Sequence, residues 1–216
     1  MDPLHICIAL GPLAMYLLLL GSINLSTRPF LTTGARDAAA LGVGIAGFVV
    51  AGPMELFLPE SAAGRFGPYV WVMLLALYAL TVALVVLLMR PRLVIYNVAF
   101  EQLRPALASA VKRLDDEARW AGESLIMPQL GVQLHIEPTS SMKNVQLVAS
   151  GPHQSYQGWR RLEAELTTEL RSARGAPSRY GFSLIAFGLI IAGTITYWLA
   201  RDPQQVAEAL SNMLRR

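Results

Sequence analysis

The residues with the clearest capacity for chemistry are two histidines and a carboxylate in the second half of the chain. His135 and Glu137 lie two positions apart in an alternating stretch, and His153 follows the next turn-like segment. Two histidines and one carboxylate can bind zinc and leave a coordination position open for water. Polar residues at i and i+2 also form the solvent face of any half-buried strand, and no second ligand pair of fixed spacing accompanies them. A membrane-bound metal-dependent enzyme is therefore the weakest of three functional hypotheses.

Glu55 is an ionisable residue within an apolar stretch, between Pro53 and Pro59. Charged side chains inside a membrane are costly and often serve an ion or proton path. The other interpretation, which we favour, is that Glu55 lies near a helix end and reaches the membrane interface. The second hypothesis is thus a small transporter or channel subunit that forms its path by oligomerising around the second apolar segment, with Glu55 in the path.

Trp159, Arg160 and Arg161 form a short aromatic and basic run. Aromatic and basic residues favour the membrane interface, so these three are candidates for contacts with lipid headgroups or with a partner. The alternative is a Trp that packs in a core beside two solvated arginines.

Other reactive side chains form no recognisable site. Ser140 and Ser141 lack the glycine-flanked turn that presents a serine nucleophile. Cys7 is the only cysteine, which excludes an intrachain disulfide and a cysteine metal cluster. We therefore expect no catalytic residue, no cofactor and no metal apart from the histidine candidate above.

The composition indicates which elements must position these residues. Of the 216 residues, 54% are hydrophobic and 15% are charged, whereas about a quarter of the residues of a soluble domain are charged. A bilayer core about 30 Å thick requires roughly 20 helical residues. Four stretches reach that length with no charge deep in their middle, and they are residues 4–23, 38–58, 68–89 and 180–200. The sequence predicts an integral membrane α-helical protein with four transmembrane helices, three of them within residues 1–89.

The second of these stretches carries small residues at a spacing of four, which are Ala38, Gly42 and Ala46. Small side chains at that spacing let helix backbones approach closely where lipid supplies no hydrophobic driving force between helices. We expect this segment to pack inside the helical bundle.

Residues 90–179 have the charge density of a soluble domain. They hold 12 basic and 9 acidic residues, with the two signs interleaved. Such interleaving is unlike the clustered basic face of a nucleic-acid binder, so we exclude nucleic acid as a partner. The pattern predicts a small inserted α+β domain with the order β-α-β-β-β-α.

The strands and helices of this domain follow from hydrophobic periodicity. Val132, Leu134 and Ile136 alternate with polar residues, which is typical of a half-buried strand. Leu162, Leu166 and other apolar residues recur at helical spacing. The predicted strands are residues 93–96, 124–127, 132–137 and 145–149, and the predicted helices are residues 99–118 and 156–173.

Basic residues beside the apolar stretches predict the orientation. Arginines at the ends of residues 90–179 place that domain in the cytoplasm and both termini outside it. Residues 201–216 predict a short amphipathic tail on the opposite membrane surface. The preference for Arg over Lys and the abundant Ala are typical of GC-rich coding and suggest a multi-pass protein of a bacterial inner membrane.

The leading hypothesis is a non-enzymatic protein that binds a partner, scaffolds or regulates through its membrane-tethered domain. Its expected partners are the lipid bilayer and other membrane or cytoplasmic proteins, or further copies of itself.

Overall fold

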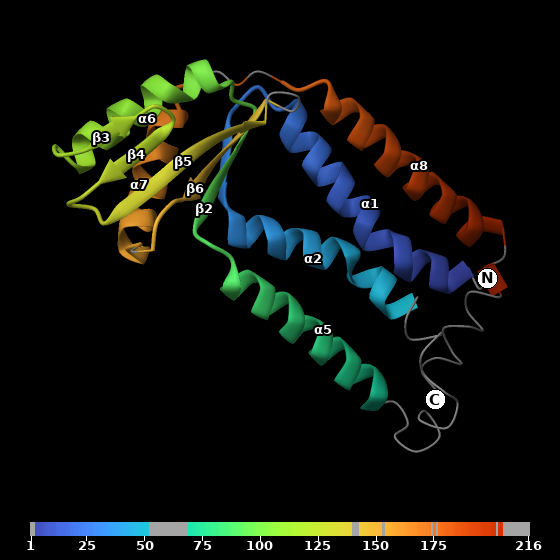
Figure 1. Ribbon diagram of the computed structural model, residues 1–216. Helices are drawn as coiled ribbons and strands as arrows, with labels where there is room; N and C mark the ends of the chain where they lie inside the picture. Colours follow the sequence, from blue (N-terminus) through green and yellow to red (C-terminus); the bar gives the residue numbers. More distant parts are fainter. Residues whose placement is uncertain are drawn as a thin grey trace. The chain divides into compact units, whose positions relative to one another are not determined.

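The computed structural model describes residues 3–51, 69–139, 143–152, 154–173, 175, 177–201 and 203–204. In chain order its elements (Figure 1) are α1 (Pro3–Leu25), β1 (Phe30–Thr33), α2 (Gly34–Ala51), α5 (Tyr69–Leu88), β2 (Arg92–Tyr96), α6 (Phe100–Leu114), β3 (Arg119–Ala121), β4 (Ser124–Met127), β5 (Val132–Thr139), β6 (Asn144–Ala149), α7 (Tyr156–Leu170) and α8 (Tyr180–Arg201). They form two compact units. The helical unit is drawn from Met1–Leu20, Ala38–Leu87 and Ser183–Arg216, and the α+β unit is drawn from Gly21–Asp37 and Leu88–Phe182.

The α+β unit contains one six-stranded sheet in which all neighbouring strands are antiparallel. Its strand order is β1-β2-β6-β5-β4-β3. The four predicted strands occur as β2, β4, β5 and β6, but the predicted order β-α-β-β-β-α is wrong because the sheet has two further strands. These are the edge strands β1 and β3, which are four and three residues long.

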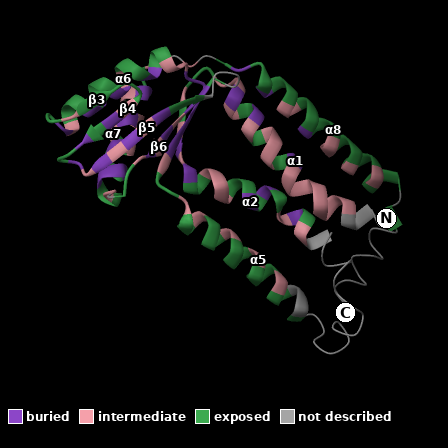
Figure 2. Ribbon diagram, in the orientation of Figure 1, coloured by how far each residue is buried: buried purple, intermediate pink, exposed green. Residues whose placement is uncertain are grey.

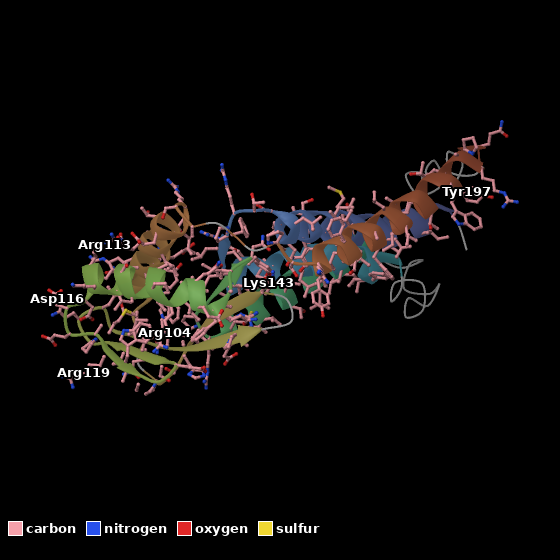
Figure 3. The ribbon with its side chains drawn as sticks, turned by 90° about the horizontal axis from the view of Figure 1, so that it is seen from above. Arg104, Arg113, Asp116, Arg119, Lys143 and Tyr197 are labelled. Carbon is pink, nitrogen blue, oxygen red and sulfur yellow. The ribbon has the colours of Figure 1, made fainter. Side chains whose placement is uncertain are left out.

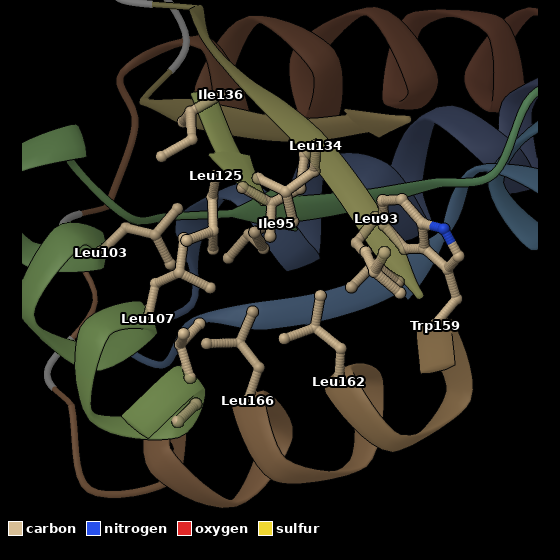
Figure 4. Close-up of a cluster of buried hydrophobic side chains, with 14 of the residues drawn as sticks. Leu93, Ile95, Leu103, Leu107, Leu125, Leu134, Ile136, Trp159, Leu162 and Leu166 are labelled. Atoms are coloured by element: carbon tan, nitrogen blue, oxygen red, sulfur yellow. The ribbon is translucent and has the colours of Figure 1, made fainter. Parts of the chain in front are cut away.

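Helices α6 and α7 cover one face of this sheet (Figure 4). Leu107 of α6 and Leu166 of α7 meet Ile95 and Leu134 of the central strands, and all four side chains are buried. The alternation along β5 sends Val132, Leu134 and Ile136 to this core, as the period of two requires. The burial of these side chains is the main contribution to the stability of the α+β unit.

Local sequence features mark the start of α7 and the end of α6. In α7, the Ser155 hydroxyl accepts a 3.1 Å hydrogen bond from the backbone N–H of Gly158 and so caps the first turn. Helix α6 continues through Pro105 and ends before Asp115, whose backbone is extended. The prediction of a helix over residues 99–118 was therefore about four residues too long at its C-terminal end.

The prediction of four transmembrane helices is wrong. Within the described residues, two helices are long and apolar enough to cross a membrane, and these are Ile6–Leu25 and Tyr180–Arg201. Helix α2 begins at Gly34 with Arg36 and Asp37 in its first turn, and its apolar part up to Ala51 spans only about 21 Å at 1.5 Å per residue. The described apolar part of α5, Val72–Leu88, is also shorter than a span.

The residues of the two units differ in how far they are buried (Figure 2). Residues of the central strands are largely buried, whereas most described residues of α5 and α8 are exposed. Apolar side chains that stay exposed on a helix mark surfaces suited to lipid or to a partner. Of the predicted tail over residues 201–216, residues 202 and 205–216 lie outside the described part of the chain.

A candidate functional site along the β1 edge of the sheet

The β1 edge of the sheet is where α1, α2 and α8 join the α+β unit. Strand β1 pairs antiparallel with β2, with Phe30 opposite Tyr96 and Thr33 opposite Leu93. Helix α2 begins at Gly34, directly after β1 ends at Thr33. The connection between α1 and α2 is therefore part of the sheet, and no linker separates strand from helix.

Asn97 attaches the end of α1 to this edge. Its side chain is fully buried, and its Nδ2 donates a hydrogen bond to the carbonyl of Ile23 in the last turn of α1. The backbone of Asn97 is left-handed, with a φ of 60°, a conformation that Asn adopts more readily than most residues. The chain turns here from β2 into α6, and the backbone N–H of Val98 donates to the carbonyl of Lys143 at 2.9 Å.

The segment before α8 is attached to the same edge. The backbone N–H of Gly175 donates to the carbonyl of Thr27 at 2.7 Å, and that of Ser178 donates to the carbonyl of Asn24 at 2.9 Å. A Cβ on Gly181 would come within 2.8 Å of Cγ of Leu25, so the first turn of α8 and the last turn of α1 pack closely. The last turn of α1 and the first turn of α8 thus lie side by side within the α+β unit.

The first turn of α2 is held by side chains. The Tyr96 hydroxyl donates to Oδ1 of Asp37 at 2.6 Å, and Nη1 of Arg36 lies 2.8 Å from Oε1 of Glu163 on α7. The Arg92 side chain packs directly on Gly34, where a Cβ would overlap it. The ends of α1, α2 and α8 that belong to the α+β unit are therefore bonded or packed at this edge.

The metal candidate lies elsewhere, on the sheet face opposite α6 and α7. His135 and Glu137 share that face, and Nδ1 of His135 lies 3.1 Å from Oγ of Ser124 on the neighbouring strand. Among the residues that the structure describes, no three His, Cys, Asp or Glu side chains are grouped to hold a metal ion. His153 lies outside those residues, so the zinc hypothesis stays a prediction.

Trp159 belongs to the core. Its side chain is buried on the α7 face that packs on the sheet, and its Nε1 donates to Oε1 of Gln154 at 3.0 Å. Arg160 and Arg161 are exposed on the other side of the helix. The structure therefore separates the three candidates for headgroup or partner contacts, and only the two arginines face outward.

Gln154 and Asp115 are polar residues that sequence reasoning missed. Nε2 of Gln154 donates to the carbonyls of Gln133 and Ser150 at 3.0 and 2.6 Å. The buried Asp115 carboxylate accepts from the backbone N–H groups of Glu117, Gln129 and Leu130 at 3.0, 2.8 and 3.1 Å. Both hold turns in place. Neither has a sequence signal beyond its place in a loop.

Two basic residues of α6 that Figure 3 labels, Arg113 and Arg104, contact side chains of neighbouring elements. Arg113 of α6 pairs with Glu169 and, at 2.7 Å, with Glu165 of α7, and the hydrogen bond with Glu169 raises the pKa of the Arg113 guanidinium. Arg104 lies over the Trp120 ring, 5.9 Å from its centroid. These contacts join α6 to α7 and to β3.

In the helical unit, Gly42 is buried against α5. A Cβ there would come within 2.8 Å of Val82, and the Tyr78 hydroxyl donates to the Gly42 carbonyl at 2.5 Å. Gly47 lies against the carbonyl of Ile8 in α1. The other predicted packing residues, Ala38 and Ala46, are half-buried. Glu55 lies outside the described residues, so the transporter hypothesis also stays a prediction.

No protein-family model matches this chain, and no curated protein or solved structure matches it.

Proposed function

We propose that this protein is a membrane-associated, non-enzymatic scaffolding or regulatory protein that binds another protein through its α+β unit. The observation that carries the proposal is β1, because this edge strand continues into α2 without a linker residue. When a strand is followed by a helix with no residue between them, a movement of the strand also moves the first turn of the helix. Because β1 and β3 are opposite edges of one sheet, partner binding near β3 would act on α2 by shifting the sheet as a whole.

The surface proposed for the partner is the sheet face opposite α6 and α7, toward β3. Exposed side chains there include Arg119, Ile126 and Glu137, one from each of the strands β3, β4 and β5. Ile126 is 38% exposed, so this face presents an apolar side chain among polar ones. A mixed face with an apolar centre is typical of protein interfaces that form and dissociate.

The hydrogen bonds of the buried polar side chains support the non-enzymatic part of the proposal. The Asp115 carboxylate and the Gln154 amide bond to backbone groups of turns and strands, and the Asn97 amide bonds to the backbone of α1. Groups engaged in this way stabilise the fold and are not presented to a substrate.

Helix α8 supports the membrane association. Tyr180 begins the helix and Tyr197 lies near its end, so about 26 Å separates them at 1.5 Å per residue, close to the bilayer core. Aromatic residues favour the two interfaces of a membrane, and Arg179 and Arg201 lie just outside this pair. Within the helix, Thr194 and Thr196 donate their hydroxyls to carbonyls four residues earlier at 2.9 and 2.8 Å, which satisfies them without water.

In the proposed orientation the α+β unit faces the cytoplasm, and α1 and α8 cross the membrane from it. Arg28, Arg90 and Arg179 lie next to the helix ends at the α+β unit, as the preference of basic residues for the cytoplasmic side requires.

Two measurements test the proposal. Alkaline carbonate washing of native membranes should leave the full chain in the pellet, and its release into the supernatant would exclude α1 and α8 as anchors. A photo-crosslinking residue at Ile126 should then capture one discrete protein in cells. The same residue at Thr168, exposed on α7, is the matched control. Equal capture at both positions, or capture at neither, would refute the partner face.

A further inference from the structure

Three stretches of the sequence carry basic residues and no acidic ones. Residues 21–33, 140–148 and 172–182 contain four basic residues and no Asp or Glu. The three of these that the structure describes are Arg28, Lys143 and Arg179, and all three are exposed. In α6 and α7, by contrast, basic and acidic residues are interleaved, as in the contacts of Arg113 with Glu165 and Glu169.

Contacts within the α+β unit bring these segments together. Nζ of Lys143 donates to the carbonyl of Pro177 at 3.4 Å, two residues before Arg179. Ser178, beside Arg179, is bonded to Asn24, and Gly175 is bonded to Thr27, beside Arg28. Figure 3 shows Lys143 at the opposite end of the unit from Arg113, Asp116 and Arg119. We call Arg28, Lys143 and Arg179 the basic corner.

The basic corner lies at the ends of the two helices that are apolar and long enough to cross a membrane. Arg28 is three residues beyond the end of α1 at Leu25, and Arg179 immediately precedes α8. Within the described part of the chain, neither arginine forms an ion pair. Two aromatic residues follow at once, and they are well exposed, Tyr180 at 47% and Phe182 at 69%. Arg179 is thus followed along α8 by exposed aromatic side chains.

We propose that the basic corner binds the phosphate of an anionic phospholipid, whose acyl chains lie along the first turns of α8. This inference rests on the proposed membrane association. Arginine donates in a planar fork that suits phosphate oxygens, and lysine adds a point charge. The ligand is a lipid rather than free phosphate because the exposed Tyr180 and Phe182 offer contacts only to an amphipathic molecule.

The test uses the full chain purified in a neutral detergent, with phosphatidylglycerol and phosphatidylcholine added at equal concentration and the retained lipid counted by native mass spectrometry. Phosphatidylglycerol should be retained in preference. Because each basic residue near a membrane surface adds about fivefold to anionic lipid binding, R28Q/K143Q/R179Q should retain at least about tenfold less. The matched control R104Q/K112Q/R171Q removes two arginines and one lysine from exposed positions on α6 and just after α7, and it should retain as much as the native chain.

Further arms separate the alternatives. R28K/R179K, which keeps the charge, should recover most of the binding, and 1 M NaCl should release phosphatidylglycerol from the native chain by screening, an outcome that requires no variant to fold. Equal retention of both lipids, or equal loss in the R104Q/K112Q/R171Q control, would overturn the proposal. Displacement by millimolar inorganic phosphate would overturn the assignment to lipid. None of these outcomes tests carbonate resistance, so the proposed membrane association is tested separately by the carbonate wash.

Discussion

The Tyr96 hydroxyl donates a 2.6 Å hydrogen bond to Oδ1 of Asp37, and it thereby joins the last residue of β2 to the first turn of α2. Tyr96 is 8% exposed, so its hydroxyl would lose solvation without a partner. The acceptor is a carboxylate, and hydrogen bonds to charged groups are stronger than neutral ones. This bond connects the sheet to α2 through side chains, in addition to the direct chain connection from β1 into α2.

Removing that hydroxyl should weaken the α+β unit. We expect Tyr96→Phe to lower the free energy of unfolding by about 1–3 kcal/mol, because the Asp37 carboxylate loses a donor in a partly buried place. Thermal or urea unfolding of the full chain in neutral detergent, followed by circular dichroism, measures the change. Tyr156→Phe is the matched control, since Tyr156 is 73% exposed. Equal effects of the two substitutions would show that the bond contributes nothing.

Two substitutions at Asn97 separate its backbone from its side chain. Both Asn97→Gly and Asn97→Ala remove the hydrogen bond to Ile23. Glycine adopts a φ of 60° freely, whereas alanine keeps a Cβ and adopts this φ less readily than asparagine does. Alanine should therefore destabilise the protein by about 1 kcal/mol more than glycine. Equilibrium unfolding in the same detergent gives the comparison. If the alanine variant were as stable as the glycine variant, the strain argument would be wrong.

Asp115 should be essential for the stability of the α+β unit. Asp115→Ala leaves three backbone N–H groups without their acceptor, two of them on Gln129 and Leu130, and should cost about 2–4 kcal/mol. Its neighbour Asp116 is exposed, so Asp116→Ala should change stability by less than about 0.5 kcal/mol. Hydrogen exchange adds a local readout, with faster exchange expected at Leu130 in the first variant alone. Unchanged protection there would contradict the assigned bonds.

Gly158 should not tolerate a methyl group. A Cβ at this position of α7 would overlap the Leu130 carbonyl and come within 2.7 Å of Val132 Cγ2. Alanine normally favours a helix over glycine by about 1 kcal/mol, so a net loss of stability in Gly158→Ala would report the close approach of α7 to the sheet. Gly193 of α8 provides the comparison, because a Cβ there meets no described atom within 4 Å. A neutral or stabilising effect at Gly158 would refute the packing.

Local periodicity was enough to predict the core of the α+β unit. The alternation of Val132, Leu134 and Ile136 and the helical spacing of Leu162 and Leu166 depend on residues a few positions apart, and burial followed both patterns. Trp159 shows the limit of such reasoning. Its position on the apolar side of α7 was visible, yet its burial against the sheet depended on where the helix packs.

The candidate site was not predictable in the same way. Strand β1 is a four-residue segment whose partner β2 lies about 60 positions later, so nothing local distinguishes it from a loop between helices. β3 has three exposed residues and no alternation. The bonds of Asn97 to Ile23 and of Tyr96 to Asp37 join residues 74 and 59 positions apart in the sequence. Pairing of this kind is decided by the packed sheet and not by short-range pattern.

The sequence by itself determined where the chain is apolar, where it is charged and which short segments alternate, because these properties reside in each residue and its near neighbours. The tertiary structure alone decided that two described helices have the length of a membrane span, that β1 belongs to the sheet, and that Arg28, Lys143 and Arg179 share one corner. The physical reason is that helix ends and strand partners depend on contacts between distant segments, which form only when the chain packs.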